Sequence, residues 1–450
     1  MEIKLEKKYG LITAIAMVVG IVIGSGVFFK AEKVLTATGG NLTLGILAWV
    51  IGGIIMISCA YTFAVMATKY QYVNGIVDYA EATMGKTYGY YVGWFMALIY
   101  YPTLTSVLAW VSARYTCVLV GFPITGGECM IIACLYLIGS YALNALSPIL
   151  AGKFQVSTTI IKLIPLTLMA VVGTVIGISS GMTITNFTTV VKEVNTLNAL
   201  FTAVVATAFA YEGWIIATSI NAELRDAKKN LPLALVAGTF TIMIIYILYY
   251  IGLAGAVTNK VMMSGGEAGA KLAFQTIFSS VGGSLIFVFV IISCLGTLNG
   301  LMLGCTRGIY SIAVRGFGPK PKVFKQIDKE TNMPTNSAVL GLLLCAIWLL
   351  FFYGANLTKP WFGFFCFDSS ELPIVTIYAM YIPIFIMMIR KEKDLSFFKR
   401  FVMPIISLAG CIFMIIAACF SHKMAVVAYL IVFAIVMIVG AKFSNKAVAQ

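Results

Sequence analysis

The chain has 450 residues, of which 60% are hydrophobic and only 11% are charged. Its mean hydropathy of +0.97 excludes a soluble globular domain and predicts an all-α integral membrane protein with many spans. The net charge of +14 does not indicate nucleic-acid binding, because the Lys and Arg residues lie in short stretches between apolar segments.

Apolar segments long enough to cross a bilayer, which takes about 20 helical residues, recur along the whole chain. We predict twelve spans, near residues 10–29, 42–68, 88–121, 128–148, 155–179, 199–221, 232–257, 280–314, 336–354, 361–389, 401–420 and 424–443. Of the 31 Lys and Arg residues, 21 fall in alternate connecting stretches beginning with the N-terminus, 7 fall in the opposite stretches and 3 fall within or beside spans. This bias predicts a multi-pass plasma-membrane protein with both termini in the cytoplasm.

The first apolar segment contains Gly24-Ser25-Gly26. Glycine weakens a helix interior by about 1 kcal/mol relative to alanine, so the tripeptide favours a break. A break within lipid is tolerated only where it is buried in protein or lines a cavity, and its free N–H groups can then bind a charged group of a solute. The alternative is close helix packing, since Gly20 and Gly24 form a small-xxx-small pair.

The sixth apolar segment carries a second interruption, Glu212-Gly213, near its middle. The first and sixth segments begin two five-span halves, 1–179 and 199–389, and two additional spans follow in 401–443. Interruptions at matching positions of two halves predict a binding site at the interface of inverted repeats.

Other polar residues in the spans have two interpretations each. Lys162 in the fifth segment is either a fixed or titrating charge, or it snorkels to the cytoplasmic edge. Asp368 and Glu371 in the tenth segment either face a cation, a substrate amine or Arg114, or mark a kink; Arg114 itself is expected to form a structural ion pair. In the seventh segment, Tyr246, Tyr249 and Tyr250 either reach a central cavity with a hydroxyl or serve packing. In the eighth segment, Ser293 and Thr297 share a helix face that either coordinates sodium or packs against another helix.

Residues typical of catalytic or metal centres are sparse. The single histidine, His422, and ten scattered cysteines without a CxxC pair predict no metal site and no cofactor. An intramembrane enzyme is disfavoured because no nucleophile stands with a base, and a channel is disfavoured because no filter loop repeats.

Several motifs stand in the order found in a known family. They are Gly24-Ser25-Gly26-Val27-Phe28, Phe209-Ala210-Tyr211-Glu212-Gly213-Trp214, Asn221-Ala222-Glu223-Leu224 with Asn230-Leu231-Pro232, and the run Arg307, Tyr310, Arg315, Gly316 and Pro319. Together they resemble the amino acid–polyamine–organocation (APC) superfamily, and within it the bacterial permeases similar to the light subunits of heteromeric amino acid transporters. The resemblance implies a LeuT-like fold of five plus five inverted-repeat helices with two helices added, in which helices 1 and 6 are interrupted.

The resemblance also implies roles for residues of this chain. Backbone N–H groups at Ser25 and Gly26 would hold the substrate carboxylate, and carbonyls near Val22 and around Phe209 and Glu212 would meet the α-amine. Phe209 would close over the substrate, and Lys162 would occupy the space of a sodium ion. The predicted substrate site therefore comprises Val22, Ser25, Gly26, Phe209, Glu212 and Gly213.

We therefore expect sodium-independent secondary transport of amino acids by alternating access, either as an exchanger or linked to protons. The alternative is a carrier of cationic amino acids or polyamines. Glu212 stands where many members of the family have glycine or aspartate, and if it faces the site it would bind an extra cationic group, whereas if it turns away a neutral amino acid is favoured. The expected partners are a small amino acid and the lipid bilayer. Which amino acid is carried, the oligomeric state and an accessory glycoprotein stay open.

Overall fold

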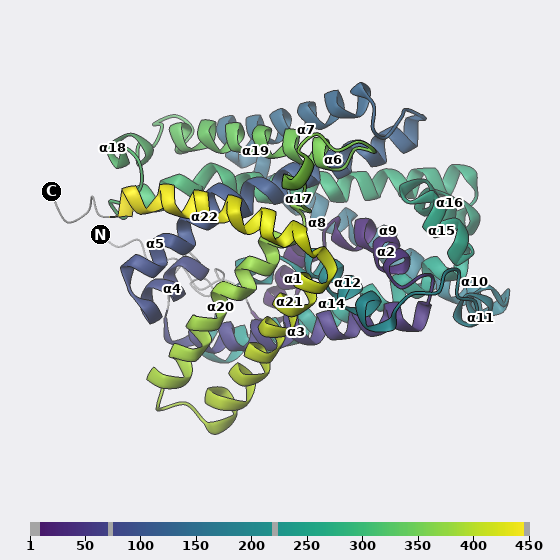
Figure 1. The fold of residues 1–450 in the computed structure, drawn as a ribbon, viewed down its shortest axis with the longest axis horizontal. Helices are drawn as coiled ribbons and strands as arrows, with labels where there is room; N and C mark the ends of the chain where they lie inside the picture. Colours follow the sequence, from purple (N-terminus) through teal and green to yellow (C-terminus); the bar gives the residue numbers. More distant parts are fainter. Residues whose placement is uncertain (1–9, 71–74, 218–223, 445–450) are drawn as a thin grey trace. The chain divides into compact units, whose positions relative to one another are not determined.

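The computed structural model describes residues 10–70, 75–217 and 224–444, which form helices and connecting turns with no β-sheet (Figure 1). The helices are α1 Leu11–Val22, α2 Gly26–Ala37, α3 Leu42–Lys69, α4 Ile76–Met84, α5 Lys86–Phe95, α6 Tyr101–Val120, α7 Gly127–Leu146, α8 Pro148–Ile161, α9 Leu163–Leu168, α10 Thr174–Ser179, α11 Met182–Thr188, α12 Thr196–Tyr211, α13 Trp214–Ala217, α14 Ala227–Ala256, α15 Asn259–Gly265, α16 Glu267–Phe278, α17 Ser280–Val314, α18 Pro321–Phe324, α19 Thr335–Ala355, α20 Leu372–Lys391, α21 Met403–His422 and α22 Met424–Ser444. Short π-helical or 3₁₀ turns occur at Met96–Tyr100, Met169–Gly173, Gly363–Phe365 and Phe398–Val402.

Among the described residues, 10 helical runs are long and apolar enough to cross a membrane. They correspond to ten of the twelve predicted segments. The other two segments, 10–29 and 199–221, contain the shorter apolar helices α1 and α12. The all-helical membrane class is therefore confirmed, and the count of twelve spans stays a prediction.

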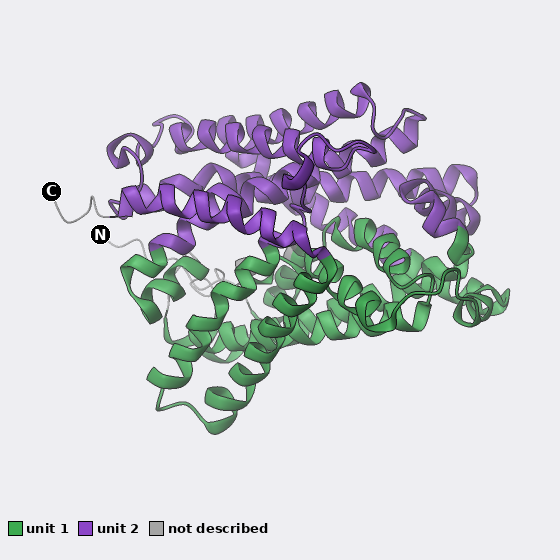
Figure 2. Ribbon diagram, in the orientation of Figure 1, with its two compact units in different colours: residues 1–89, 169–260, 374–421 green, residues 90–168, 261–373, 422–450 purple. Residues whose placement is uncertain are grey.

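The contacts divide the chain into two compact units (Figure 2). Unit 1 comprises residues 1–89, 169–260 and 374–421, and unit 2 comprises residues 90–168, 261–373 and 422–450. Each unit takes segments from both predicted halves, 1–179 and 199–389, so packing and the predicted sequence repeat divide the chain differently. The repeat stays a prediction.

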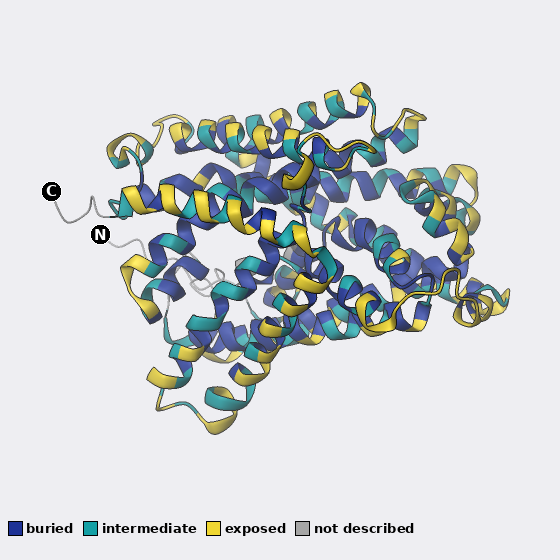
Figure 3. Cartoon of the chain, in the orientation of Figure 1, coloured by how far each residue is buried: buried dark blue, intermediate teal, exposed yellow. Residues whose placement is uncertain are grey.

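Exposed residues recur along the long helices (Figure 3), and many of them have large apolar side chains. On α7, Ile131, Leu135 and Ile138 are all exposed, and their spacing places them on one helix face. A soluble protein rarely leaves such a stripe uncovered, whereas a helix that faces lipid needs one.

Two predicted boundaries were wrong. The first segment was expected to end at Phe29, but α2 continues to Ala37, so Lys30 and Lys33 lie in a helix instead of a loop. Charged residues lower the local hydropathy without ending a helix.

The tenth span begins later than predicted, because α20 starts at Leu372. The aromatic run that precedes it raised the hydropathy without forming a long helix. Asp368 and Glu371 thus lie ahead of the helix, and the expectation that they stand inside an apolar span was wrong. The Oδ1 atom of Asp368 accepts hydrogen bonds from the backbone N–H (2.7 Å) and the hydroxyl (2.5 Å) of Ser370, which organises the turn into α20.

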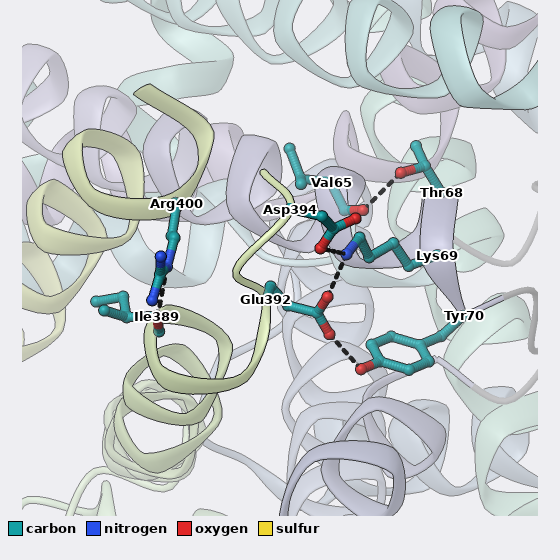
Figure 4. A network of polar contacts seen from close by, with 8 residues as sticks. All are labelled: Val65, Thr68, Lys69, Tyr70, Ile389, Glu392, Asp394 and Arg400. Carbon is teal, nitrogen blue, oxygen red and sulfur yellow. Dashed lines mark hydrogen bonds and ion pairs between the residues drawn. The ribbon is translucent and has the colours of Figure 1, made fainter. Parts of the chain in front are cut away.

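A polar cluster in unit 1 joins the C-terminal end of α3 to the chain after α20 (Figure 4). Lys69 forms ion pairs with Glu392 and Asp394, and the Tyr70 hydroxyl donates to Glu392 at 2.5 Å. The hydrogen bond from Lys69 lowers the pKa of the exposed Asp394 carboxyl below its usual value. Both connecting stretches were assigned to the same side of the membrane by their charges.

Candidate functional site

The first helix break lies in unit 1 between α1 and α2. α1 ends at Val22, Ile23 is extended (ψ 109°), and α2 begins at Gly26, with Ser25 at the N-cap position but without a capping hydrogen bond from its side chain. The first N–H groups of α2 have no partner within the helix, and the helix dipole places partial positive charge there. Such a helix end is suited to binding an anion.

The second break follows α12 in the same unit. α12 ends at Tyr211, Glu212 is extended (ψ 155°), and Gly213 has φ +109°. An L-residue with a side chain rarely adopts such a φ, so glycine is needed at position 213 for the chain to leave the helix here. The resumed helix, α13, begins at Trp214.

The two breaks touch each other through Gly26. A Cβ atom on Gly26 would lie 2.5 Å from the Cα of Ala210 and 3.0 Å from the carbonyl oxygen of Phe209. Only glycine therefore allows α2 to approach α12 this closely. The contact brings together predicted site residues from the first break and from the end of α12, and it gives Gly26 the packing role that was the alternative interpretation.

Tyr246 of α14 connects the two breaks. Its fully buried hydroxyl lies 3.3 Å from the carbonyl oxygen of Val22 and 3.1 Å from that of Ala210, so its single proton is shared between these two acceptors. The seventh-segment tyrosines had been left open between cavity and packing. For Tyr246 the structure shows a hydroxyl that fixes the backbone of both breaks.

Ser25 has a hydroxyl with no hydrogen-bond partner among the described residues, although the residue is 0% exposed. A buried hydroxyl without a partner costs about 1–3 kcal/mol. Within the described part of the chain, four other buried serine or threonine hydroxyls share this property. Ser140 and Ser293 lie inside the continuous helices α7 and α17, Thr183 lies in the first turn of the short helix α11, and Ser369 lies in the turn before α20. Ser25 differs from them because its hydroxyl stands at the first helix break, beside N–H groups of α2 that also lack intrahelical partners.

The remaining residues of the predicted substrate site surround the second break. The Phe209 ring is buried and makes an edge contact with Phe29, with centroids 5.9 Å apart. Glu212 lies within electrostatic range of Tyr378 and Tyr381 of α20, which also belongs to unit 1.

Lys162 belongs to unit 2, at the turn between α8 and α9, and is 2% exposed. Its backbone N–H donates to Thr158 at 3.0 Å. Thr158 in turn lies against α17, where a Cβ on Gly296 would be 2.3 Å from the Thr158 hydroxyl oxygen. The side chain is therefore enclosed by protein, and this burial does not support snorkelling.

Arg114 forms the structural ion pair that was expected, with Glu267 of α16 at 2.9 Å. Asp368 and Glu371 had been considered as its partners, and this was wrong. Glu371 instead contacts His422, with 3.0 Å between carboxylate oxygen and imidazole Nε2. In the eighth span, the Thr297 hydroxyl donates to the Ser293 carbonyl at 3.1 Å, a bond within the helix.

A sequence profile described as amino acid permease matches residues 9–441. The chain belongs to the amino acid permease family. The APC resemblance of the sequence motifs is thereby confirmed, although the part of the motif at Asn221-Ala222-Glu223 lies outside the described residues.

Curated relatives of this permease carry the names of amino acid transporters. The serine/threonine exchanger SteT of Bacillus subtilis is 29% identical over 91% of either chain. The Asc-type amino acid transporter 1 of Mus musculus is 26% identical over 76% of this chain and 64% of its own length. The b(0,+)-type amino acid transporter 1 of Homo sapiens is 25% identical over 77% of this chain and 70% of its own.

Proposed function

We propose that this permease is a secondary transporter of amino acids that works by alternating access around the two helix breaks. Transport is sodium-independent and proceeds by exchange or with protons. The observation that carries the proposal is the partnerless Ser25 hydroxyl at the N-terminus of α2, which lies against the end of α12. The names of the relatives support amino acids as the substrate class.

In this proposal the substrate carboxylate accepts hydrogen bonds from the Ser25 hydroxyl and from the free N–H groups of α2. Bonds to an ionised group contribute about 1.5–3 kcal/mol each, roughly twice a neutral bond. The α-ammonium donates to carbonyl oxygens near Val22 and Phe209. Tyr246 holds the Val22 carbonyl in place, and that oxygen keeps a second lone pair for the substrate.

We also propose that α1–α2 and α12–α13 are the interrupted first and sixth of twelve spans arranged as five plus five repeats. Contacts between connecting stretches support the assignment of sides. Within unit 1, Gly39 accepts hydrogen bonds from the N–H groups of Val191 and Lys192, and Gly40 accepts one from Asn259. All of these residues fall in stretches that the charge bias assigns to the outside, while the Lys69 cluster falls on the cytoplasmic side.

Lys162 takes the part of a coupling cation in this proposal. Its burial in unit 2 supports a functional role for the lysine, because an ammonium group in an apolar environment costs free energy and is rarely kept without a function. Uptake by the wild-type protein should then be the same in sodium and in choline buffers. A requirement for a sodium gradient would contradict this role.

The substrate site is tested with purified protein in proteoliposomes loaded with one amino acid. Ser25→Ala removes the hydroxyl without adding volume, and we expect the KM for exchange to rise about tenfold or more, as expected for a lost bond to a charged group. Ser58→Ala is the matched control, because Ser58 is also buried in unit 1 but its hydroxyl bonds the Ile55 carbonyl within α3. If the KM is unchanged in Ser25→Ala, the carboxylate is not bound there.

A further inference from the structure

Lys30 of α2 is a fully buried cation enclosed by aromatic rings. Its exposed fraction is 0%, and its ammonium lies 5.1 Å from the centre of the Phe29 ring and 5.2 Å from that of Phe209. An ammonium within about 6 Å of an aromatic face is held by the quadrupole of the ring. This arrangement keeps a positive charge inside unit 1 without exposing it to water.

This charge lies one helical turn from the first break. Lys30 follows Gly26 by four residues, so both project from the same face of α2, about 6 Å apart along its axis. Gly26 faces Phe209 and Ala210 of α12, and the Lys30 ammonium also contacts Phe209. The ammonium therefore lies along the α2–α12 contact, on the side of the break toward Ala37.

Three other charged residues, one cationic and two acidic, lie on this part of α2 or at the second break. Lys33 places a second ammonium 4.7 Å from the centre of the Phe29 ring, but this residue is partly exposed, so solvent screens its charge more than that of Lys30. Glu32 accepts a hydrogen bond from Thr36 at 2.8 Å, at the exposed side of the helix. Glu212 at the second break lies near the tyrosines of α20, Tyr378 and Tyr381.

We propose that Lys30 determines the substrate class of the site, admitting amino acids with neutral or acidic side chains and excluding those with a second positive charge. The inference rests on the proposed function. Two unit charges about 10 Å apart in a protein interior repel by an amount worth about tenfold in binding, and the repulsion grows at shorter distance. Lysine, arginine and diamines would bring such a charge to the break, whereas serine would not.

The test measures exchange of labelled L-serine in proteoliposomes and its inhibition by unlabelled L-lysine and L-serine. In the wild type we expect L-lysine to inhibit only at a much higher concentration than L-serine. Lys30→Met should lower the half-inhibiting concentration of L-lysine about tenfold while that of L-serine changes little. Lys30→Arg keeps the charge and should keep the wild-type ratio, and Lys33→Met is the control for removing one cation from the same helix.

Equal inhibition by L-lysine and L-serine in the wild type would overturn the proposal even if Lys30→Met did not fold. An unchanged ratio in folded Lys30→Met, or an equal change in Lys33→Met, would overturn it as well. Each of these results leaves serine exchange intact, and so leaves the proposed function standing. Absence of exchange with every amino acid offered would refute the proposed function and the role of Lys30 together.

Discussion

Two regions of this permease bury polar groups among apolar helices and treat them in opposite ways. In unit 2, the side chains of Asn144 in α7 and Asn299 in α17 bond each other at 2.9 Å. The Asn144 amide also donates to the Ser140 carbonyl at 2.9 Å, and the Asn299 amide lies 3.2 Å from both the Ala151 carbonyl and the Gln155 side chain. In unit 1, the Ser25 hydroxyl is buried with no partner in the described part of the chain.

The difference separates a structural role from a binding role. A polar network whose groups are satisfied by protein fixes the helices that carry it. A partnerless hydroxyl beside free N–H groups at a helix end leaves hydrogen-bonding capacity for a solute. Loss of an asparagine should therefore reduce stability, and loss of Ser25 should reduce transport.

The largest effect is expected where the breaks themselves touch. Gly26→Val would force a branched side chain into the backbone of Ala210 and Phe209, and we expect a loss of about 3 kcal/mol or more, enough to prevent correct folding. The measurement is the fraction of monodisperse protein in size-exclusion chromatography, followed by thermal unfolding in detergent. Gly139→Val is the control, because no atom lies within 4 Å of a Cβ at that position. Equal stability of the two variants would contradict the close approach of α2 to α12.

Asn299→Ala should give the next largest effect. It removes the bond between the two asparagine side chains and takes the amide donor away from the Ala151 carbonyl and the Gln155 side chain, while Asn144 keeps its bond to the Ser140 carbonyl. Each lost bond costs about 0.5–1.5 kcal/mol. Thermal unfolding in detergent should show the loss, whereas exchange per folded molecule should stay near that of the wild type. Asn336→Ala, at an exposed position, is the control. A transport defect in folded Asn299→Ala would remove the distinction between the two regions.

The gaps between α1 and α2 and between α12 and α13 fall where the sequence disfavours helix, because the cause is local. That they interrupt the first and sixth of twelve spans stays a proposal. Gly24-Ser25-Gly26 and Glu212-Gly213 disfavour helix by composition alone, and Gly213 indeed has a positive φ. That Arg114 forms an ion pair could also be predicted. Its partner Glu267 could not, because the two residues are 153 positions apart in the sequence.

Features that depend on distant contacts could not be predicted. The hydroxyl of Tyr246 and the carbonyl of Val22 are 224 positions apart, and no pattern within α14 singles out this tyrosine from Tyr249 and Tyr250. Lys30 was assigned to a loop because hydropathy treats any lysine as polar. Its burial depends on the Phe209 ring, which another segment supplies. The predicted start of the tenth segment, at residue 361, was too early for a similar reason, since hydropathy cannot distinguish an irregular aromatic run from a helix.

Ser25→Ala should reduce transport and leave stability unchanged, the opposite of what is expected for Asn299→Ala. Because the hydroxyl has no protein partner, its removal should leave the stability unchanged or raise it by up to about 1 kcal/mol. The measurement is thermal unfolding in detergent without substrate, with Ser58→Ala in parallel. Since the Ser58 hydroxyl is bonded within α3, its loss should cost about 0.5–1.5 kcal/mol. Destabilisation of Ser25→Ala beyond that of Ser58→Ala would mean that the hydroxyl serves the fold.

The smallest effect is expected at Asp394, the exposed member of the partly buried Lys69 cluster, which takes no part in the breaks. The Asp394 carboxyl has a pKa below the usual range because Lys69 donates to it, so it stabilises the folded state above the ordinary carboxyl pKa of about 3.9. That contribution is lost as the pH falls through the lowered pKa. Asp394→Asn should therefore unfold slightly earlier than the wild type at pH 7, and the difference should vanish in strong acid and shrink in high salt. A difference that persists in acid would mean that the residue acts through packing, because a protonated carboxyl and an amide carry the same charge.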